Sequence, residues 1–520
     1  MRTLSVVDIG TNSIRLGVVR IDDNHNYHPL ALNKEVIRLG EGEFGHNRLT
    51  KAAMERGLLV LKKFADIANA YNSSEIVVVA TAAAREAQNR AEFVERAREE
   101  AGVEVKVISG IEEARLIYLG VSSGIDLNSH TALFVDIGGG TTELILGGSH
   151  DYSLLESLKL GAIRFSDMFH THEQSPVSEK TYRKMVDYSL GVANHAVRKI
   201  ADQGYDLLVG SSGTIMNLAE ITARRLEGEI SSIRNYYLKY EDLQETISIL
   251  CKLDLRQRLN VPGINPDRAD IIVSGAAILD AIMKGVKAPG IQISDRALRD
   301  GLVIDRLFQE DTVREAYLGT SVRERSIMQL GRACRFEENH GQKVAGLAGS
   351  IFDQLKQLGI HPYGKVEREL LTYAALMHDI GTFISYGDHH KHSYYLVRNS
   401  NLLGFTDDEI EIVATAAMCH RKLTPQKLRP QRMSAASVRM ADVLCSILRI
   451  SDALDRSQLG LVSEVICRFV QGNKVLSIEV YATEDCPLEM WALENKKSFF
   501  ERIFGVGIII KRVVMGKPGG

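Results

Sequence analysis

The sequence has few of the features that mark secreted, fibrous or membrane proteins. Its six cysteines are widely scattered over 520 residues and form no Cys-x-x-Cys pair, so a reduced chain is expected. Ten prolines and 43 unclustered glycines exclude a collagenous or low-complexity chain. No apolar run approaches the roughly 18 residues of a membrane span, and the acid at position 8 comes too early for a signal peptide. We therefore expect a cytoplasmic protein without membrane contact.

The overall composition is that of an ordinary globular protein, with 45% hydrophobic and 25% charged residues, which excludes a disordered chain. At roughly 150 residues per domain, the length predicts three or four domains. The formal net charge of -3 by itself indicates no class of partner.

One pattern occurs twice. Residues 4–19 and 132–147 each read as an apolar β-rich run, then Asp-Ile-Gly, then small polar residues, then a second apolar run. Each copy predicts a β-hairpin with a turn of small residues. The copies lie 128 positions apart (136 − 8), which predicts two similar domains that face each other.

The rest of the chain changes texture along its length. Segments with helical periodicity alternate with segments that are typical of strands. The helical segments are 50–70, 90–101, 178–202 and one from about 215, and the strands are 75–80 and 206–209. A loop is expected at 210–214, between the last strand and the last helix. This alternation predicts an α/β architecture with a mixed or parallel sheet up to about residue 305. Residues 323–455 show helical periodicity only, and 460–512 contain alternating strand-like stretches. The expected domains are 1–125, 126–305, 306–458 (all-α) and 459–520 (small, β-containing).

The two repeated turns are candidate phosphate-binding loops. Turns without bulky side chains let backbone N–H groups converge on phosphate oxygens, and hydroxyls add donors. The candidate ligands are Thr11, Asn12, Ser13, Gly138, Gly139, Gly140 and Thr141. Asp8 and Asp136, at the end of each first strand, could hold a cation beside those phosphates. The alternative is a pair of plain hairpin turns in which glycine only supplies positive φ.

A third loop, residues 210–214, adds Ser212, Gly213 and Thr214 as candidate ligands. The three loops together resemble the phosphate loops of the superfamily that contains actin, sugar kinases and acetate kinase. This resemblance implies two ribonuclease-H-like domains around an active-site cleft. It does not decide between kinase, ATPase and phosphatase.

A pair of glutamates narrows the choice. Ser109 followed by Glu112 fits a capping box at a helix start, which would occupy Glu112 and leave Glu113 free. A free carboxylate in the cleft could deprotonate a water that attacks phosphorus, as a phosphohydrolase requires. The alternative is that both acids only stabilise the helix N-terminus.

Seven motifs occur in order: Asp-Ile-Gly-Thr-Asn-Ser (8–13), Ala-Thr-Ala-Ala-Ala-Arg (80–85), Ser-Gly-Ile-Glu-Glu-Ala-Arg-Leu-Ile (109–117), Asp-Ile-Gly-Gly-Gly-Thr-Thr-Glu (136–143), Gly-Ser-Ser-Gly-Thr (210–214), Val-Pro-Gly (261–263) and Ser-Asp-Arg-Ala-Leu-Arg-Asp-Gly (294–301). Together they resemble the exopolyphosphatase / guanosine pentaphosphate phosphohydrolase (Ppx/GppA) family over essentially the whole chain. The resemblance implies that Glu113 is the catalytic base and that Arg85 binds substrate phosphate, rather than pairing with Glu86 at the surface. Glu143 could assist Asp136 and Asp8 in binding Mg²⁺ or could face solvent.

The helical region carries the order His…His-Asp…His…Asp, at His340, His378, Asp379, His420 and Asp452. This order resembles metal-dependent HD-type phosphohydrolases, and imidazole with carboxylate suits a divalent metal. A second metal site is one interpretation. The other is an HD-like scaffold whose histidines cap helices or bind polyanion, and we expect the scaffold. His389, His390 and His392 could contact polyphosphate or form a solvated loop.

Basic residues cluster after His420. The segment from 421 to 449 has seven Lys/Arg against one acid, and its candidate polyanion track is Arg421, Lys422, Lys427, Arg429 and Arg432. Such a patch could hold a long phosphate chain in a salt-dependent way. With a single tryptophan and no aromatic platform in view, nucleic acid is an unlikely partner.

The resulting prediction is an exopolyphosphatase that processively releases orthophosphate from the end of inorganic polyphosphate, with Mg²⁺ or another divalent cation. The alternatives are hydrolysis of guanosine pentaphosphate at the same site, and a polyphosphate or nucleotide sensor with incidental turnover. The family resemblance also suggests a homodimer.

Overall fold

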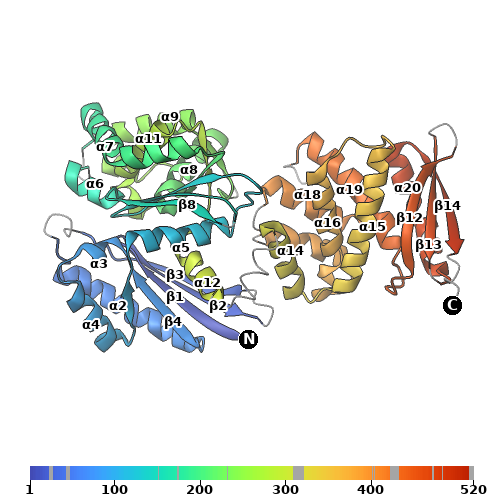
Figure 1. The fold of residues 1–520 in the computed structure, drawn as a ribbon, viewed down its shortest axis with the longest axis horizontal. Coiled ribbons are helices and arrows are strands. Elements are labelled where there is room, and N and C mark those ends of the chain that lie inside the picture. Colours follow the sequence, from blue (N-terminus) through green and yellow to red (C-terminus); the bar gives the residue numbers. More distant parts are fainter. Residues whose placement is uncertain are drawn as a thin grey trace. The chain divides into compact units, whose positions relative to one another are not determined.

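The computed structural model describes residues 1–22, 27–41, 47–149, 151–171, 175–230, 232–308, 321–400, 402, 405–421, 433–470, 474–482 and 484–514. The chain divides into two compact units, Met1–Thr320 and Ser321–Gly520 (Figure 1). No helix among the described residues is long and apolar enough to cross a membrane.

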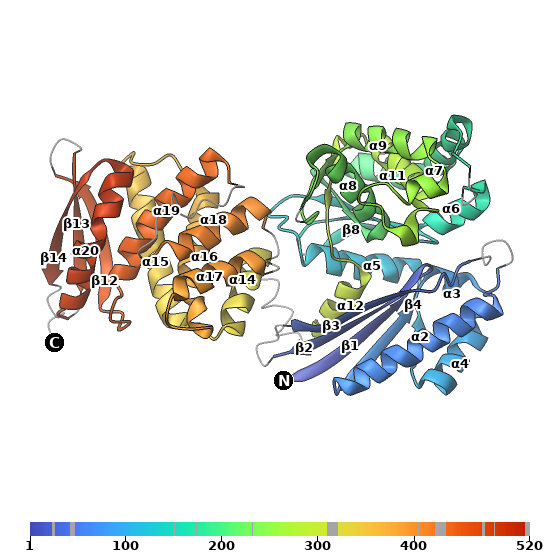
Figure 2. The same cartoon turned by 180° about the vertical axis from the view of Figure 1, so that it is seen from behind.

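The first lobe of the N-terminal unit is a five-stranded mixed sheet with the order β3-β2-β1-β4-β5. Its strands are β1 (Arg2–Ile9), β2 (Ser13–Ile21), β3 (Tyr27–Val36), β4 (Glu75–Ala80) and β5 (Val105–Val107). Its helices are α2 (Lys51–Ala70), α3 (Ala82–Glu86), α4 (Arg90–Ala101), α5 (Gly110–Ser122) and α12 (Leu298–Leu307). Figure 2 shows α2 and α4 on one face of the sheet and α5 with α12 on the other. Each face therefore has its own apolar core, in keeping with side chains that alternate along each strand.

The second lobe is a six-stranded sheet with the order β10-β11-β9-β6-β7-β8. Its strands are β6 (Ala132–Ile137), β7 (Thr142–Gly147), β8 (Tyr152–Leu158), β9 (Leu207–Ser211), β10 (Tyr237–Lys239) and β11 (Gly290–Ile293). Its helices are α6 (Ala162–Phe169), α7 (Glu179–Gln203), α8 (Ser212–Glu227), α9 (Tyr240–Lys252), α10 (Leu255–Arg258), η1 (Pro266–Arg268) and α11 (Ile272–Gly285). α5 contacts β7 and β8 and thus lies between the two sheets (Figure 1).

The sequence repeat is also a structural repeat. β1 and β2 pair antiparallel with Asp8 opposite Arg15, and β6 and β7 pair with Asp136 opposite Glu143. Both offsets equal the 128 positions of the repeat. The two hairpins were therefore correctly predicted, and the mixed sheets follow from a parallel strand, β4 or β9, beside each hairpin.

The chain returns from the second lobe to the first through α12. This helix follows the last strand of the second lobe but packs on β1 and α5 of the first. The contact is backbone to backbone, because a Cβ on Gly301 would lie 1.8 Å from the Leu116 carbonyl oxygen. A Cβ on Gly120 would likewise meet the Ala297 carbonyl oxygen at 2.2 Å. Residues 298–305, expected in the second domain, thus belong to the first lobe. Sequence pattern does not show to which sheet a helix returns.

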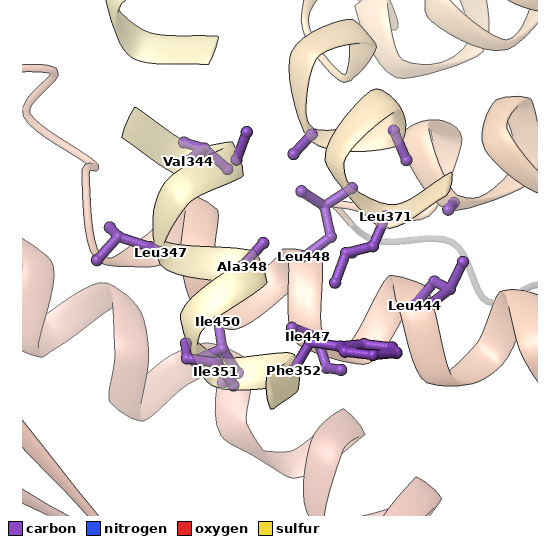
Figure 3. Packing of buried hydrophobic residues seen from close by; sticks show 14 of the residues in the cluster. Val344, Leu347, Ala348, Ile351, Phe352, Leu371, Leu444, Ile447, Leu448 and Ile450 are labelled. Carbon is purple, nitrogen blue, oxygen red and sulfur yellow. The ribbon is translucent and has the colours of Figure 1, made fainter. Parts of the chain in front are cut away.

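The C-terminal unit combines helices with a three-stranded sheet of order β12-β13-β14. Its helices are α14 (Val322–Ala333), α15 (Glu338–Gln357), α16 (Lys365–Met377), η2 (Ile380–Phe383), α17 (His389–Asn399), α18 (Asp407–Met418), α19 (Ala435–Ala453) and α20 (Pro487–Phe504). Its strands are β12 (Val462–Phe469), β13 (Val475–Ala482) and β14 (Gly507–Val514). Figure 3 shows side chains of α15, α16 and α19, among them Val344, Leu371 and Leu448, gathered in the core of this unit.

The expected separate domain at 459–520 is not observed. Residues of β12, β13, α20 and β14 belong to the same apolar cluster as the helices. The alternating pattern correctly predicted strands there. It could not show that their buried face packs on α15 rather than on a core of its own.

Candidate active site

A polar cavity of about 80 Å³ lies where the two hairpin turns of the N-terminal unit meet. Its lining includes most of the residues predicted for phosphate binding, cation binding and catalysis: Asp8, Thr11, Asn12, Ser13, Glu113, Asp136, Gly138, Gly139, Gly140, Thr141, Ser212 and Gly213. The two lobes of the N-terminal unit, which the repeat predicted to face each other, do so at this cavity.

The two turns have the same backbone geometry. The Gly10 N–H donates to the Ser13 carbonyl oxygen at 3.0 Å, and the Gly138 N–H donates to the Thr141 carbonyl oxygen at 2.9 Å. A Cβ on Gly139 would approach the Thr11 Cβ to 2.9 Å, so the turns of the two lobes almost touch. Glycine is required here by close approach.

The third predicted loop is not a loop. β9 ends at Ser211 and α8 begins at Ser212, whose φ of 86° lies in the left-handed region. This strained residue turns the strand directly into the helix. The N-terminus of a helix favours an anion, and that of α8 opens at the cavity. Thr214 is not in the cavity lining and instead accepts a hydrogen bond from Arg268 at 3.2 Å.

Two buried aspartates from different lobes line the cavity. Asp8 Oδ1 has no hydrogen-bond partner, and both side-chain polar atoms of Asn12 also lack one. Burial raises the pKa of Asp8 to about 6, with a contribution from nearby Asp136. Burial also raises the pKa of Asp136, although Ser211 donates a hydrogen bond to its Oδ2. Two buried carboxylates beside a cavity, one of them with an unpartnered oxygen, are suited to a divalent cation.

Glu113 is the third carboxylate of the cavity. Ser109 caps α5 by accepting from the Glu112 N–H at 3.1 Å, which fixes the first turn so that Glu113 points inward and is 7% exposed. Arg85 Nη1 donates to Glu113 Oε2 at 2.8 Å. Burial outweighs this guanidinium and raises the pKa of Glu113 to about 7, a value suited to a general base at neutral pH.

The neighbouring acids have other roles. Glu112 binds Arg115 at 2.8 and 2.9 Å, so the second half of the expected capping box is absent. Glu86 pairs with Arg164 at 2.9 Å instead of with Arg85. Glu143 is 1% exposed, which excludes the solvent-facing alternative. It lies behind the cavity lining, where it accepts from Ser157 at 2.8 Å, and burial with the charge of Glu113 raises its pKa.

Two arginines in the cavity were not predicted. Arg15 leaves the first turn on β2, opposite Asp8. Arg268 comes from η1 and lies against Gly213, since a Cβ there would be 2.2 Å from its Nη2. Burial, together with the charge of Arg15, lowers the pKa of Arg268 to about 10, so Arg268 remains cationic at neutral pH. Arg15 could have been found as the polar residue opposite Asp8, whereas nothing in the sequence links residue 268 to the turns.

The predicted residues of the C-terminal unit fall into two groups. His340, His378, Asp379, His420 and Asp452 converge, and His389 joins them, although the sequence placed it in a polyanion contact or a solvated loop. Of the polyanion track only Arg421 is described, with its guanidinium 5.8 Å from the Tyr386 ring centroid. Lys422, Lys427, Arg429 and Arg432 lie outside the described residues.

The cavity is built for phosphate chemistry. Two glycine turns, a helix N-terminus and two arginines offer donors and positive charge to phosphate oxygens. Two carboxylates can hold a cation, and a third has a pKa near 7. A buried carboxylate in this position can take a proton from an attacking water, as a phosphohydrolase requires.

The comparisons with known proteins agree with this geometry. The chain resembles a solved exopolyphosphatase from Cytophaga hutchinsonii at 29% identity, covering 59% of this chain and 98% of that one, with a TM-score of 0.55. It resembles an exopolyphosphatase-like protein at 26% identity over 58% and 98%, with a TM-score of 0.53. The fold is also that of an Aquifex aeolicus Ppx/GppA family member, at 24% identity over 60% and 99% and a TM-score of 0.51.

These likenesses confirm the expected pair of ribonuclease-H-like α/β domains in the N-terminal half. Residues 17–310 match the Ppx/GppA phosphatase family, and residues 322–497 match Ppx/GppA phosphatase, domain III. The chain therefore belongs to the Ppx/GppA phosphatase family and is a hydrolase of phosphoric anhydrides.

Proposed function

We propose that the protein is an exopolyphosphatase that removes the terminal phosphate of inorganic polyphosphate as orthophosphate. The observation that carries this proposal is the buried Glu113 carboxylate at the wall of a cavity lined by two phosphate-type turns. The family acts on polyphosphate and on guanosine pentaphosphate, so the substrate depends on what else the cavity can bind.

The cavity lining favours a purely inorganic chain. Its apolar members among the described residues are aliphatic: Ala82, Ile117, Ile137, Ile271, Ala297 and Leu298. It therefore offers a purine base no aromatic side chain for stacking, which nucleobase sites commonly provide. The likeness to the Cytophaga hutchinsonii exopolyphosphatase points the same way.

The residues divide the reaction among them. The two turns, the α8 N-terminus, Arg15 and Arg268 bind and orient the terminal phosphates. Glu113 takes a proton from a water whose oxygen forms a bond to the terminal phosphorus. The bridging P–O bond breaks, and the shortened chain leaves with the electron pair while orthophosphate is released. Arg85 orients Glu113 and, when a phosphate approaches, can share its guanidinium with that phosphate.

Asp8 and Asp136 fit a Mg²⁺ ion. The unpartnered Asp8 Oδ1 and the raised pKa of both carboxylates favour the binding of a cation between them. Mg²⁺ bound there would neutralise charge on the phosphates. Glu143 would support it from behind the lining.

The test compares orthophosphate release from long polyphosphate and from guanosine pentaphosphate, with the same purified protein and Mg²⁺. We expect the higher kcat/KM with polyphosphate. As a matched control, inorganic tripolyphosphate should inhibit at least as well as GTP, because the base gains no stacking contact. A clear preference for the nucleotide in both assays would overturn the substrate assignment.

A further inference from the structure

The C-terminal unit contains six buried or half-buried ligand-type side chains brought together by five helices. His340 lies in α15, His378 and Asp379 follow α16, His389 begins α17, His420 follows α18 and Asp452 lies in α19. All four imidazoles are at most 6% exposed and Asp452 is 4% exposed. Only the Asp379 side chain, at 33%, is open to solvent.

Each imidazole uses its Nδ1 for an oxygen outside the cluster. His378, His389 and His420 each contact a backbone carbonyl, those of Ala375 at 2.6 Å, Tyr386 at 3.0 Å and Ala417 at 2.6 Å. His340 contacts Asp455 at 2.8 Å. A carbonyl only accepts, so the three Nδ1 atoms facing one must carry the proton, and a carboxylate has the same effect on His340. The four Nε2 lone pairs are thereby left for another ligand, as in metal-binding histidines.

The Nε2 atoms point at carboxylate oxygens and at one another. His378 Nε2 lies 3.6 Å from both Asp379 Oδ2 and Asp452 Oδ1, and it has no hydrogen-bond partner although it is buried. His340 Nε2 lies 3.9 Å from Asp452 Oδ1. In each of these contacts an imidazole lone pair faces a carboxylate oxygen, so both atoms are acceptors and repel each other. A cation between them removes this repulsion.

A second group of ligand atoms, from His389 and His420, surrounds the other carboxylate oxygen of Asp379. His389 Nε2 and His420 Nε2 lie 3.1 and 3.4 Å from Asp379 Oδ1 and 3.3 Å from each other. The ligand atoms of His340, His378 and Asp379 lie within 4.8 Å of one another, and so do those of Asp379, His389 and His420. Asp379 belongs to both groups and offers one oxygen to each.

Lys496 does not satisfy the cluster. Its ammonium group binds Asp452 Oδ2, whereas the contacts of His340 and His378 are to Oδ1, which is left for a metal. A proton shared between His389 and His420 would provide a hydrogen bond only between those two imidazoles. It would leave the His378 Nε2 without a partner.

We propose that these six side chains form a two-metal centre for divalent transition metal ions, bridged by Asp379. His340, His378 and Asp452 complete the first site, and His389 with His420 complete the second. Imidazole nitrogens with carboxylate oxygens select this class of ion over Mg²⁺ or Ca²⁺. The first site has four protein ligands and the second has three, so a six-coordinate ion would keep coordination positions open at the exposed side of Asp379. The centre lies in the C-terminal unit and does not depend on the function proposed for the cavity.

The test measures metal content and stoichiometry. The full-length Asp8→Asn/Asp136→Asn protein, in which the cavity carboxylates cannot compete, is stripped with a chelator, loaded with Mn²⁺ and analysed after desalting. We expect two ions per chain. His340→Ala and His389→Ala should each reduce this to one, and Asp379→Ala should reduce it to none. His392→Ala, on the same helix as His389 but outside the cluster, should retain two.

Thermal unfolding guards against misfolded variants. Mn²⁺ should raise the Tm of the parent protein and of His392→Ala, because it binds only the folded state, and should not raise that of Asp379→Ala. If Asp379→Ala is not folded without metal, Asp379→Asn replaces it. A parent protein that retains no Mn²⁺ overturns the proposal. A His389→Ala variant that still holds two ions overturns the second site.

Discussion

One guanidinium nitrogen, Nη1 of Arg85, contacts both the Glu113 carboxylate at 2.8 Å and the Ile108 carbonyl oxygen at 3.1 Å. Ile108 precedes α5, so Arg85 links the Glu113 carboxylate to the start of its own helix. The guanidinium lowers the pKa of Glu113 against the larger effect of burial, which raises it. The net pKa near 7 depends on this pair.

Glu113→Gln should lower kcat for polyphosphate by about 10²-fold or more, the range expected when a general base is lost. Polyphosphate binding should persist, because the turns and arginines are unchanged. Orthophosphate release and a separate binding measurement test both points. The matched control is Glu112→Gln, which removes an ion pair with Arg115 and should leave kcat within a few-fold. Loss of activity in the control alone would reverse the assignment.

Arg85→Gln should shift the acidic limb of the kcat/KM profile to higher pH. The guanidinium lowers the pKa of Glu113, so its removal lets burial raise that pKa further. We also expect KM for polyphosphate to rise by about tenfold, equivalent to roughly 1.4 kcal/mol of lost binding. Arg96→Gln, which breaks only the surface pair with Glu100, is the control and should change neither quantity. An unshifted profile in Arg85→Gln would contradict the electrostatic role.

The metal-free protein should lose stability as the pH rises from about 5 to 7.5. Burial raises the pKa of Asp8 to about 6 and that of Glu113 to about 7, so the folded state binds more protons than the unfolded state in this range. The free energy of unfolding then falls with increasing pH. Thermal melts in a chelator should show this, and Asp8→Asn should reduce the slope. Added Mg²⁺ should restore stability most strongly at the higher pH. A flat profile would mean that the carboxylates are neutralised in another way.

Gly301→Ala should destabilise the protein by about 1–3 kcal/mol or more, because the new Cβ would meet the Leu116 carbonyl oxygen and force α12 away from α5. Gly191→Ala is the matched control. It also lies within a helix, α7, but has no neighbour within 4 Å of the added carbon, so it should stabilise by about 0.5–1 kcal/mol. Denaturant unfolding of both variants tests the close approach. Equal effects would mean that the helices can separate without cost.

Neutralising Arg421, Lys422 and Lys427 together should weaken binding of long polyphosphate and flatten its dependence on salt, because fewer counterions are released. Hydrolysis of tripolyphosphate should barely change, since so short a chain occupies only the cavity. Binding titrations at several salt concentrations measure the slope. Equal losses for short and long chains would show that the segment acts on folding rather than on the chain.

The site residues that could be predicted were those inside local patterns. Asp8 and Asp136 end strands of a repeated hairpin, and Ser109 fixes the helix that presents Glu113, so short sequence windows specify them. Arg268 could not be found in this way, because its position depends on how η1 packs against Gly213. The capping-box spacing indicates that Glu113 is free and the resemblance implies that it is the base. The structure adds a physical reason, which is the burial of Glu113 beside Arg85.

The same limit applies to the C-terminal unit. The spacing of His340, His378, Asp379 and Asp452 indicated a cluster. His389 was assigned to a possible solvated loop because three histidines and a lysine stand close together there, yet α17 begins at this residue and directs it inward. Helix starts are the boundaries that sequence patterns define least well. The return of α12 to the first lobe likewise depends on tertiary contacts alone.

The return of α12 to the first lobe determines the order in which the two lobes can finish folding during synthesis. Leu302 and Val303 of this helix share a core with Leu4 and Val6 of the first strand. During synthesis, the first lobe therefore cannot be completed until the whole second lobe and α12 have left the ribosome. Glu113 is synthesised early, but α5, the helix that carries it, gains α12 as a partner only after residue 298. A nascent or truncated chain that ends before α12 would hence carry the proposed catalytic base, Glu113, without a finished scaffold, and we expect activity only when both lobes are present.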